Sequence, residues 1–148
     1  QSTLDSGPHH HVVIAGTGPL ETEFKKRFGR EPRVHFLGFV NQSRMPIFYR
    51  MIDLLALASS SETWGLCVNE ALACGTPCAV SNRAGCSLDL FDNTQHGRVL
   101  PWDQPKLWTS AMTELLKSPS TQWNSIHEQF HHKHFVTAVH NQFERQGS

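Results

Sequence analysis

The stretch SSSETWGLCVNEALACGTPCAV, residues 59–80, has one glutamate before a predicted helix start and another inside the helix. Glu62 precedes Gly65 by three residues, and Glu70 follows Gly65 by five within a helix expected over 64–75. An α-helix rises about 1.5 Å per residue, so Gly65 and Glu70 are separated by about 7 Å along the axis. One extended ligand could therefore contact both carboxylates.

Strands and helices alternate outward from this stretch. Apolar and β-branched runs predict strands at 11–16, 33–40, 53–60, 77–81 and 97–100. Helices are expected between them at 19–30, 43–52, 64–75 and 86–91, and the chain reads as helical from about residue 104 onward. This alternation predicts an α/β fold with a Rossmann-like parallel sheet flanked by helices, in one domain over residues 1–148.

Five residues indicate where the expected helices begin and end. Pro19 is expected at the first position of the first helix, and Gly29 near its end. Ser43 is expected to cap the second helix, in which Pro46 is tolerable only in the first turn. Gly75 closes the helix that contains Glu70, because glycine readily adopts the left-handed conformation that ends helices.

The composition favours a small-molecule partner. Thirteen basic and thirteen acidic residues balance, which gives no electrostatic reason to expect nucleic acid or an anionic membrane. No apolar run approaches the roughly 20 residues that a membrane helix needs. The first residues also lack the charged and apolar regions of a secretory signal, so a cytoplasmic chain is expected.

The cysteines and histidines offer competing interpretations as metal ligands. The four cysteines lie within twenty residues without a C-x-x-C pair, and we predict reduced core residues, with a zinc or disulfide role as the alternative. His127, His131 and His134 share one face of a predicted helix and could bind zinc, but ordinary surface histidines are favoured. The run at 9–11 fits native sequence or a tag remnant equally well.

A ligand site is expected at the carboxyl ends of the strands, where ligands bind in open parallel sheets. The loops there are 16–19, 38–43, 58–65 and 81–86. Free N–H groups and the helix dipole favour a phosphate at the helix start, and glycine at position 65 allows close approach.

Carboxylates suit sugar hydroxyls, because each one accepts several hydrogen bonds and can take vicinal hydroxyls as a pair. With Glu62 and Glu70 on either side of a diphosphate, the predicted ligand is a nucleotide sugar. The competing interpretation is structural, with Glu62 as a capping acid and Glu70 as a solvent-facing helix residue.

The segment ETWGLCVNE, followed by ALACGTPCAVSNRAG, resembles the donor-binding half of retaining GT-B glycosyltransferases, the group 1 or family-four class. VVIAGTGPLETEF is similar to the glycine turn of that family, VHFLGFV to its base-side strand, and MIDLLALASSSE to the strand that precedes the glutamate. These segments occur in the family's order from residue 12 to about 100. Their co-linearity is far more specific than the E-x7-E spacing alone.

The resemblance implies a role for each matching residue. Glu62 would be the catalytic residue that contacts the donor sugar, and Glu70 would bind the ribose hydroxyls. The backbone amides of Trp64, Gly65 and Leu66 would hold the sugar and diphosphate, and Thr63 beside them would also bind the donor. Phe39 and Val40 would line the base pocket, and Gly16 and Gly18 would keep the first loop open near the diphosphate. A plain structural turn is an equally good explanation of the two glycines in the first loop. The family reaction implies retention without a cofactor or an obligatory metal, which agrees with the lack of an Asp-x-Asp motif here.

Some family features differ or lie outside these residues. In AGCSLDLF, Gly85 matches the family pattern, whereas Cys86 and Leu88 do not. Family members have a further strand with an arginine and a lysine that neutralise the diphosphate, and an N-terminal acceptor domain. We therefore expect a fragment or natural half-protein that binds a UDP-, GDP- or ADP-sugar, transfers nothing alone and tends to self-associate. Any membrane association would come through the N-terminal half.

Two alternatives of other classes stay open. One is a non-catalytic nucleotide-binding or regulatory module on the same fold, although a binding-dead copy would not need both glutamates. The other is the related half of a GT-B epimerase or phosphorylase. A phosphorylase needs a cofactor lysine, and the expected ligand-side loops contain none of the five lysines, which are Lys25, Lys26, Lys106, Lys117 and Lys133.

Overall fold

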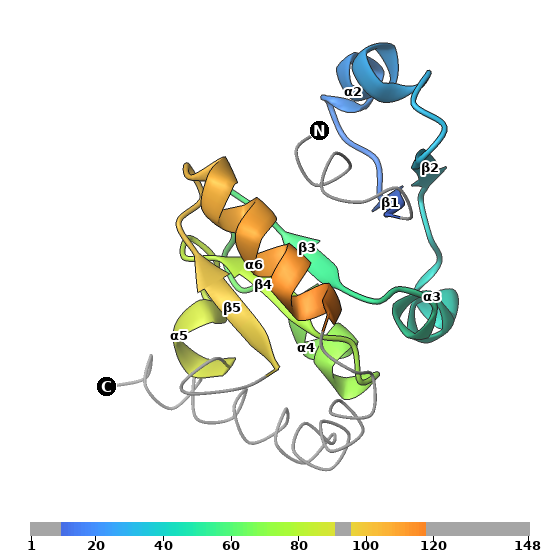
Figure 1. The fold of residues 1–148 in the computed structure, drawn as a ribbon. Helices are drawn as coiled ribbons and strands as arrows, with labels where there is room; N and C mark the ends of the chain where they lie inside the picture. The colour runs from blue at the N-terminus through green and yellow to red at the C-terminus, as the bar shows by residue number, and fades with distance from the viewer. Residues whose placement is uncertain (1–9, 91–95, 118–148) are drawn as a thin grey trace. The chain divides into compact units, whose positions relative to one another are not determined.

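The computed structural model describes residues 10–90 and 96–117, which belong to two compact units divided between Met45 and Pro46 (Figure 1). The first unit contains β1 (Val12–Ala15), α2 (Glu21–Phe28), β2 (Val34–Gly38) and the 3-10 turn η1 (Gln42–Arg44). After α3 (Met45–Met51), the second unit contains β3 (Leu55–Leu57), α4 (Leu66–Ala73), β4 (Cys78–Ser81), α5 (Ser87–Leu90), β5 (Gly97–Leu100) and α6 (Pro105–Lys117).

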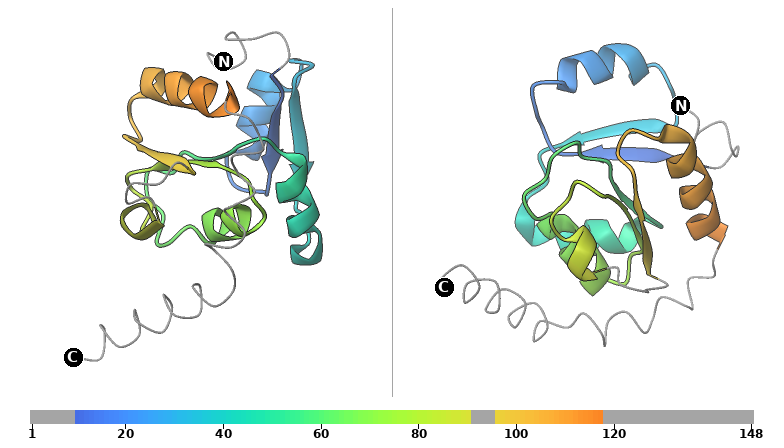
Figure 2. Two further views of the ribbon diagram at one scale, coloured as in Figure 1. Left: turned by 60° about the horizontal axis from the view of Figure 1, so that its bottom comes forward. Right: turned by 90° about the vertical axis from the view of Figure 1, so that its left-hand side faces the viewer.

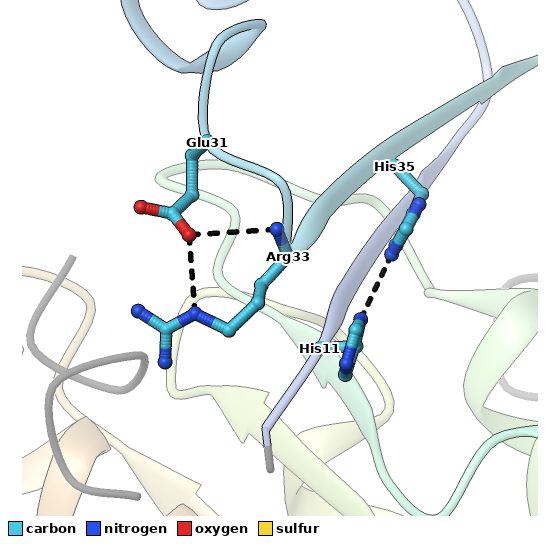
Figure 3. A network of polar contacts seen from close by, with 4 residues as sticks. All are labelled: His11, Glu31, Arg33 and His35. Carbon is cyan, nitrogen blue, oxygen red and sulfur yellow. Dashed lines mark hydrogen bonds and ion pairs between the residues drawn. The ribbon is translucent and has the colours of Figure 1, made fainter. Parts of the chain in front are cut away.

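In the first unit, β1 and β2 form a parallel pair. Val12 lies opposite Val34, and the register shifts at the end of β1, where Ala15 lies opposite Gly38. The exposed imidazoles of His11 and His35 stack across the two strands, with Nδ1 of His11 2.9 Å from Nε2 of His35 (Figure 3). Side-chain pairing thus accompanies the backbone pairing on this face.

A second polar contact precedes β2. Nε of Arg33 donates to Oε1 of Glu31 at 3.1 Å (Figure 3). Both side chains are half-buried, and the backbone N–H of Val34 donates to the Glu31 carbonyl at 3.0 Å. Pro32 lies between them, so the turn that enters β2 is fixed by both backbone and side-chain bonds.

In the second unit, β3, β4 and β5 form a parallel sheet with β4 at its centre. Leu55 lies opposite Cys78, and Cys78 lies opposite Gly97. Every residue of β4 is buried, because helices cover both faces, with α6 on one side and α4 and α5 on the other (Figure 2). The core around β4 contains Val68, Ala71 and Leu72 from α4, and Trp108, Ala111 and Leu115 from α6. Burial of these apolar side chains supplies most of the stabilisation.

The predicted fold class is confirmed, since parallel sheets flanked by helices are observed. Each observed strand falls within the range expected from the sequence. Gly75 has a φ of 84° directly after α4 and ends that helix as expected. Pro46 lies in the first turn of α3, also as expected. One domain over residues 1–148 stays a prediction.

Two predicted boundary residues were wrong. Pro19 precedes α2, whose N-cap is Leu20, because the chain is still in a turn at Pro19. Asn41, rather than Ser43, caps the next helical turn, since its Oδ1 accepts from the Ser43 N–H at 3.0 Å in an Asx turn. The prediction for Gly29 is confirmed, since Gly29 is the C-cap of α2.

Helical structure from about residue 104 is observed as α6. The rest of the predicted helical tail lies outside the described residues, together with His127, His131 and His134 and with His9 of the run at 9–11. Among the described residues, no group of three or more His, Cys, Asp or Glu side chains could hold a metal ion.

All four cysteines are free thiols in the second unit. Cys78 and Cys86 are buried, whereas Cys67 and Cys74 are half-buried. Burial is the largest cause that raises the pKa of each thiol, and it brings the pKa of Cys86 to about 11. These thiols are therefore protonated and weakly nucleophilic near neutral pH.

We expect thiol labelling to separate the cysteines by exposure. With the pKa of Cys86 at about 11, only about one Cys86 thiol in 10⁴ is ionised at pH 7, so iodoacetamide should modify it slowly and faster as the pH rises. Cys78 should also be slow, and Cys67 and Cys74 should react first. Mass spectrometry of timed digests measures each site, and chain unfolded in urea, where all four should react alike, is the control. Labelling of Cys86 at pH 7 as fast as in urea would contradict the structure.

Candidate functional site

Two loops lie side by side at the carboxyl ends of β3 and β4. The loop from β3 to α4 carries Glu62, and the loop from β4 to α5 carries Ala84 and Gly85. Glu62 and Ala84 form a parallel β-bridge, in which the Glu62 N–H donates to the Arg83 carbonyl at 3.2 Å and the Gly85 N–H donates to the Glu62 carbonyl at 3.1 Å. The backbone of Glu62 is thereby fixed from both sides.

Two glycines permit this close approach. Gly65 is the N-cap of α4 with a φ of 98°, and an added Cβ would lie 3.0 Å from Leu57 Cδ2 and 3.1 Å from Cys86 Sγ. At Gly85 an added Cβ would lie 2.2 Å from the Thr63 carbonyl oxygen. Only glycine fits both positions without a backbone shift.

The start of α4 is open to a ligand. Gly65 has no side chain to cap the helix, and the first helical bond is from the Val68 N–H to the Gly65 carbonyl at 2.9 Å. The preceding N–H groups of the first turn therefore point out of the helix, as at any helix start, and add to the positive end of the dipole. The Leu66 side chain beside them is 54% exposed. This arrangement suits an anion.

Glu62 lies at one side of this helix start. Its Oε1 accepts from the Trp64 N–H at 3.3 Å, so that amide is already bonded to the carboxylate. Nε1 of Trp64 donates to Oδ1 of Asn69 at 3.0 Å, which fixes the indole against α4. Thr63 is exposed next to these residues. The half-buried Glu62 carboxylate is thus held in place by a backbone N–H of its own loop.

Glu70 lies one and a half turns into the helix, and its carboxylate is held by a residue from α3. The hydroxyl of Tyr49 donates to Oε2 of Glu70 at 2.8 Å. Burial, followed by the hydrogen bond to Glu70 and its negative charge, raises the pKa of Tyr49 well above its usual value. The phenol therefore remains a neutral donor, and Oε1 of Glu70 has no hydrogen bond to any of the described residues.

The Cys67 thiol is influenced by the charges of both glutamates. Burial raises its pKa most, and the negative charges of Glu62 and then Glu70 raise it further. Both carboxylates are therefore within electrostatic reach of one side chain in the first turn of α4. The structure brings together the predicted residues of this loop and helix, which are Glu62, Thr63, Trp64, Gly65, Leu66 and Glu70.

Of the predicted residues in the first unit, the two glycines line a cavity and the other two residues do not. Gly16 and Gly18 line a cavity of about 320 Å³ at the carboxyl ends of β1 and β2, whose other lining includes Ile14, Phe24 and Phe36. The cavity wall is mainly apolar. Phe39 is 77% exposed and Val40 is half-buried, and neither lines this cavity.

Sequence reasoning missed Tyr49 and Asn69 as partners of the site. Tyr49 belongs to α3, 21 residues before the glutamate that it contacts, and no local pattern links the two. Asn69 falls inside the quoted stretch, but only the observed turn of the indole makes it a partner of Trp64.

The family profile described as Glycosyl transferases group 1 matches residues 2–130. The chain belongs to this family. Sulfoquinovosyl transferase SQD2 of Arabidopsis thaliana is 33% identical over 99 residues, which are 67% of this chain and 19% of that protein. A D-inositol 3-phosphate glycosyltransferase of Mycolicibacterium gilvum is 31% identical over 124 residues, or 77% of this chain and 28% of that protein. The chain thus spans less than a third of the length of these curated relatives.

Solved structures of glycosyltransferases share the fold. HepE of Anabaena in complex with UDP and glucose has a TM-score of 0.75 at 20% identity, over 98% of this chain and 43% of that one. TarM has a TM-score of 0.80 at 13% identity, over 97% of this chain and 30% of that one. The expected Rossmann-like half of a GT-B transferase is confirmed. Among the described residues, no helix combines the length and the apolar character needed to span a membrane.

We expect Gly85→Ala to destabilise the second unit, because its Cβ would overlap the Thr63 carbonyl oxygen at 2.2 Å. Overpacking of this kind costs about 1–3 kcal/mol. Gly18→Ala is the matched control, since no atom lies within 4 Å of its added Cβ. Urea unfolding followed by tryptophan fluorescence measures both. Equal midpoints for the two variants would mean that the loops do not approach as described.

Proposed function

We propose that this chain is the donor-binding part of a retaining glycosyltransferase, which transfers a hexose-type sugar from a nucleotide sugar to a glycan, lipid or small-molecule acceptor. The observation that carries this proposal is the uncapped start of α4, with Glu62 in the loop just before it and Glu70 one and a half turns into the helix. A diphosphate fits the helix start, and the two carboxylates suit the hydroxyls at its two ends.

Each residue then has one task. Glu70 accepts from the ribose hydroxyls, the N–H groups of Gly65 and Leu66 hold the diphosphate, and Glu62 accepts from the sugar. Since Trp64 N–H already donates to Glu62, we assign it to orienting that carboxylate instead of to the diphosphate. As the glycosidic bond breaks, charge grows on the leaving diphosphate, and the helix start stabilises it without a metal or other cofactor.

The remaining donor contacts are assigned to the first unit. Gly16 and Gly18 keep a loop open beside a cavity, which supports a ligand-binding role for that loop. Phe39 offers an exposed aromatic ring for the base, and Val40 follows it. The family, together with the UDP complexes of HepE, whose fold is similar, makes UDP-sugars the first donors to test, followed by GDP- and ADP-sugars.

The acceptor would bind to a further domain. The curated relatives are several times longer than this chain, which supports a partner domain for acceptor binding and an inactive isolated chain. The four free thiols fit a reducing, cytoplasmic location. Any attachment to a membrane would come from the additional domain.

We expect removal of the charge at Glu62 and at Glu70 to have different effects on ligand binding. Glu70→Gln should weaken nucleoside diphosphate and nucleotide sugar equally, because both carry the ribose. Glu62→Gln should weaken only the nucleotide sugar. A hydrogen bond to a charged group contributes roughly 1.5–3 kcal/mol, so each loss should be about tenfold to a hundredfold. Calorimetric titration of both variants with UDP, GDP, ADP and their sugars measures this.

Glu23→Gln is the control, because Glu23 is an exposed residue of α2. It should bind every ligand as the parent does. If Glu62→Gln weakened the binding of UDP and of UDP-sugar equally, Glu62 would not be the residue that binds the sugar. Binding that neither glutamate affects would leave the capping interpretation, in which both variants change stability by only a few tenths of a kcal/mol.

We expect residues 1–148 alone to self-associate. Large apolar side chains are exposed on the described residues, including Phe39 at 77%, Met51 at 78% and Leu88 at 84%. Strand edges without partners also favour association. Light scattering after gel filtration should give a mass above that of one chain, and adding the N-terminal half should restore a monomer. A monomer of the 148 residues that unfolds cooperatively and binds no hydrophobic dye would contradict this expectation.

A further inference from the structure

We propose that Tyr49 is a positioning residue for Glu70, which it holds in the orientation that accepts the ribose hydroxyls of the nucleotide. This inference rests on the proposed function, because it takes Glu70 as the ribose-binding carboxylate. Tyr49 comes from a different helix, and no motif in the glutamate stretch points to it.

The contact is built into the core. Tyr49 is 1% exposed, and its hydroxyl donates to Oε2 of Glu70 at 2.8 Å. At its other end, the Tyr49 carbonyl accepts from Oγ1 of Thr76 at 2.6 Å, and Thr76 is 3% exposed. Thr76 follows the turn that ends α4, and its own N–H donates to the Ala71 carbonyl at 2.9 Å. The phenol donor is thus anchored to the helix that carries its acceptor.

This anchor matters because a glutamate side chain has three rotatable bonds. An unrestrained Glu70 would lose that freedom when it binds ribose, and the loss would weaken binding. The Tyr49 hydroxyl fixes Oε2 before the ligand arrives. An ionised carboxylate offers about four acceptor positions, so Oε1 and the second position on Oε2 remain for two vicinal hydroxyls.

Tyr49 is the donor in this hydrogen bond, and Glu70 is the acceptor. Tyr49 can donate to Glu70 only while it is protonated, and burial together with the Glu70 charge raises the pKa of Tyr49. Tyr49 therefore keeps its hydroxyl proton well above neutral pH and stays a donor to Glu70. A tyrosine that only filled the core would need some partner for its hydroxyl, but it would not affect the recognition of ribose.

The test compares ligands that differ only in the ribose. UDP has both ring hydroxyls, whereas 2′,3′-dideoxy-UDP has neither, and the GDP or ADP pair takes their place if the protein prefers that base. In the full-length protein, Tyr49→Phe keeps the ring and removes the donor. We expect this variant to bind UDP about three- to tenfold more weakly and to bind the dideoxy compound with unchanged affinity. In a Glu70→Gln background it should cause no further loss.

Trp108→Phe is the matched control, because it removes another buried donor, the bond from Nε1 to the Pro101 carbonyl at 2.8 Å. It should lower stability and leave both affinities unchanged. If Glu70→Gln weakens the binding of UDP more than that of dideoxy-UDP but Tyr49→Phe does not, the positioning role is overturned and the proposed function stands. If Glu70→Gln leaves UDP binding intact, or no diphosphate binds, both fail.

A second measurement follows Tyr49 itself in the parent protein. The 148 residues contain a single tyrosine, so 3-fluorotyrosine incorporation gives one ¹⁹F resonance for them. In the full-length protein this resonance is identified as the one missing from Tyr49→Phe, or by labelling residues 1–148 alone. Saturating UDP should shift it and dideoxy-UDP should shift it much less. A resonance that UDP does not move would overturn the proposal.

Discussion

The candidate site depends on the backbone pairing between the loop of Glu62 and the loop of Gly85. This pairing extends the β3–β4 contact beyond the regular strands, through the bridge between Glu62 and Ala84. It is possible only because Gly85 leaves the Thr63 carbonyl accessible. The same pairing fixes where α4 begins, since the Cys86 N–H donates to the Trp64 carbonyl at 2.9 Å. The position of the helix start therefore follows from a backbone contact between two loops.

The sequence predicted the strands and the site loop well, because both depend on local patterns. Apolar runs between turn residues identified all five described strands, and the spacing of Glu62, Gly65 and Glu70 indicated the helix start. The errors are at helix starts, where neighbouring polar residues compete. Asn41 and Ser43 both suit a cap, and only the observed backbone reveals that the Asn41 amide accepts from Ser43.

Partners that are distant in sequence could not be predicted. Tyr49 reaches Glu70 because the fold brings the Tyr49 side chain of α3 to α4, which is a tertiary contact without a local signature. A buried hydroxyl needs a partner, but the sequence offers many acceptors for it. The thiols illustrate the same limit. Their spacing indicated reduced core residues, whereas the electrostatic influence of both glutamates on Cys67 emerged only from the folded chain.

The two glutamates are held by different means, and the difference has a consequence for specificity. Glu70 is part of a helix whose inner residues Val68, Ala71 and Leu72 are fully buried, so the core determines its place. Glu62 belongs to a loop that backbone hydrogen bonds hold outside the core, so exposed side chains of that loop, such as Thr63, can change at little cost to the core. Under the proposed function, the ribose end would be rigid and the sugar end adjustable. Changes of donor sugar are therefore expected in the two paired loops before they appear in α4.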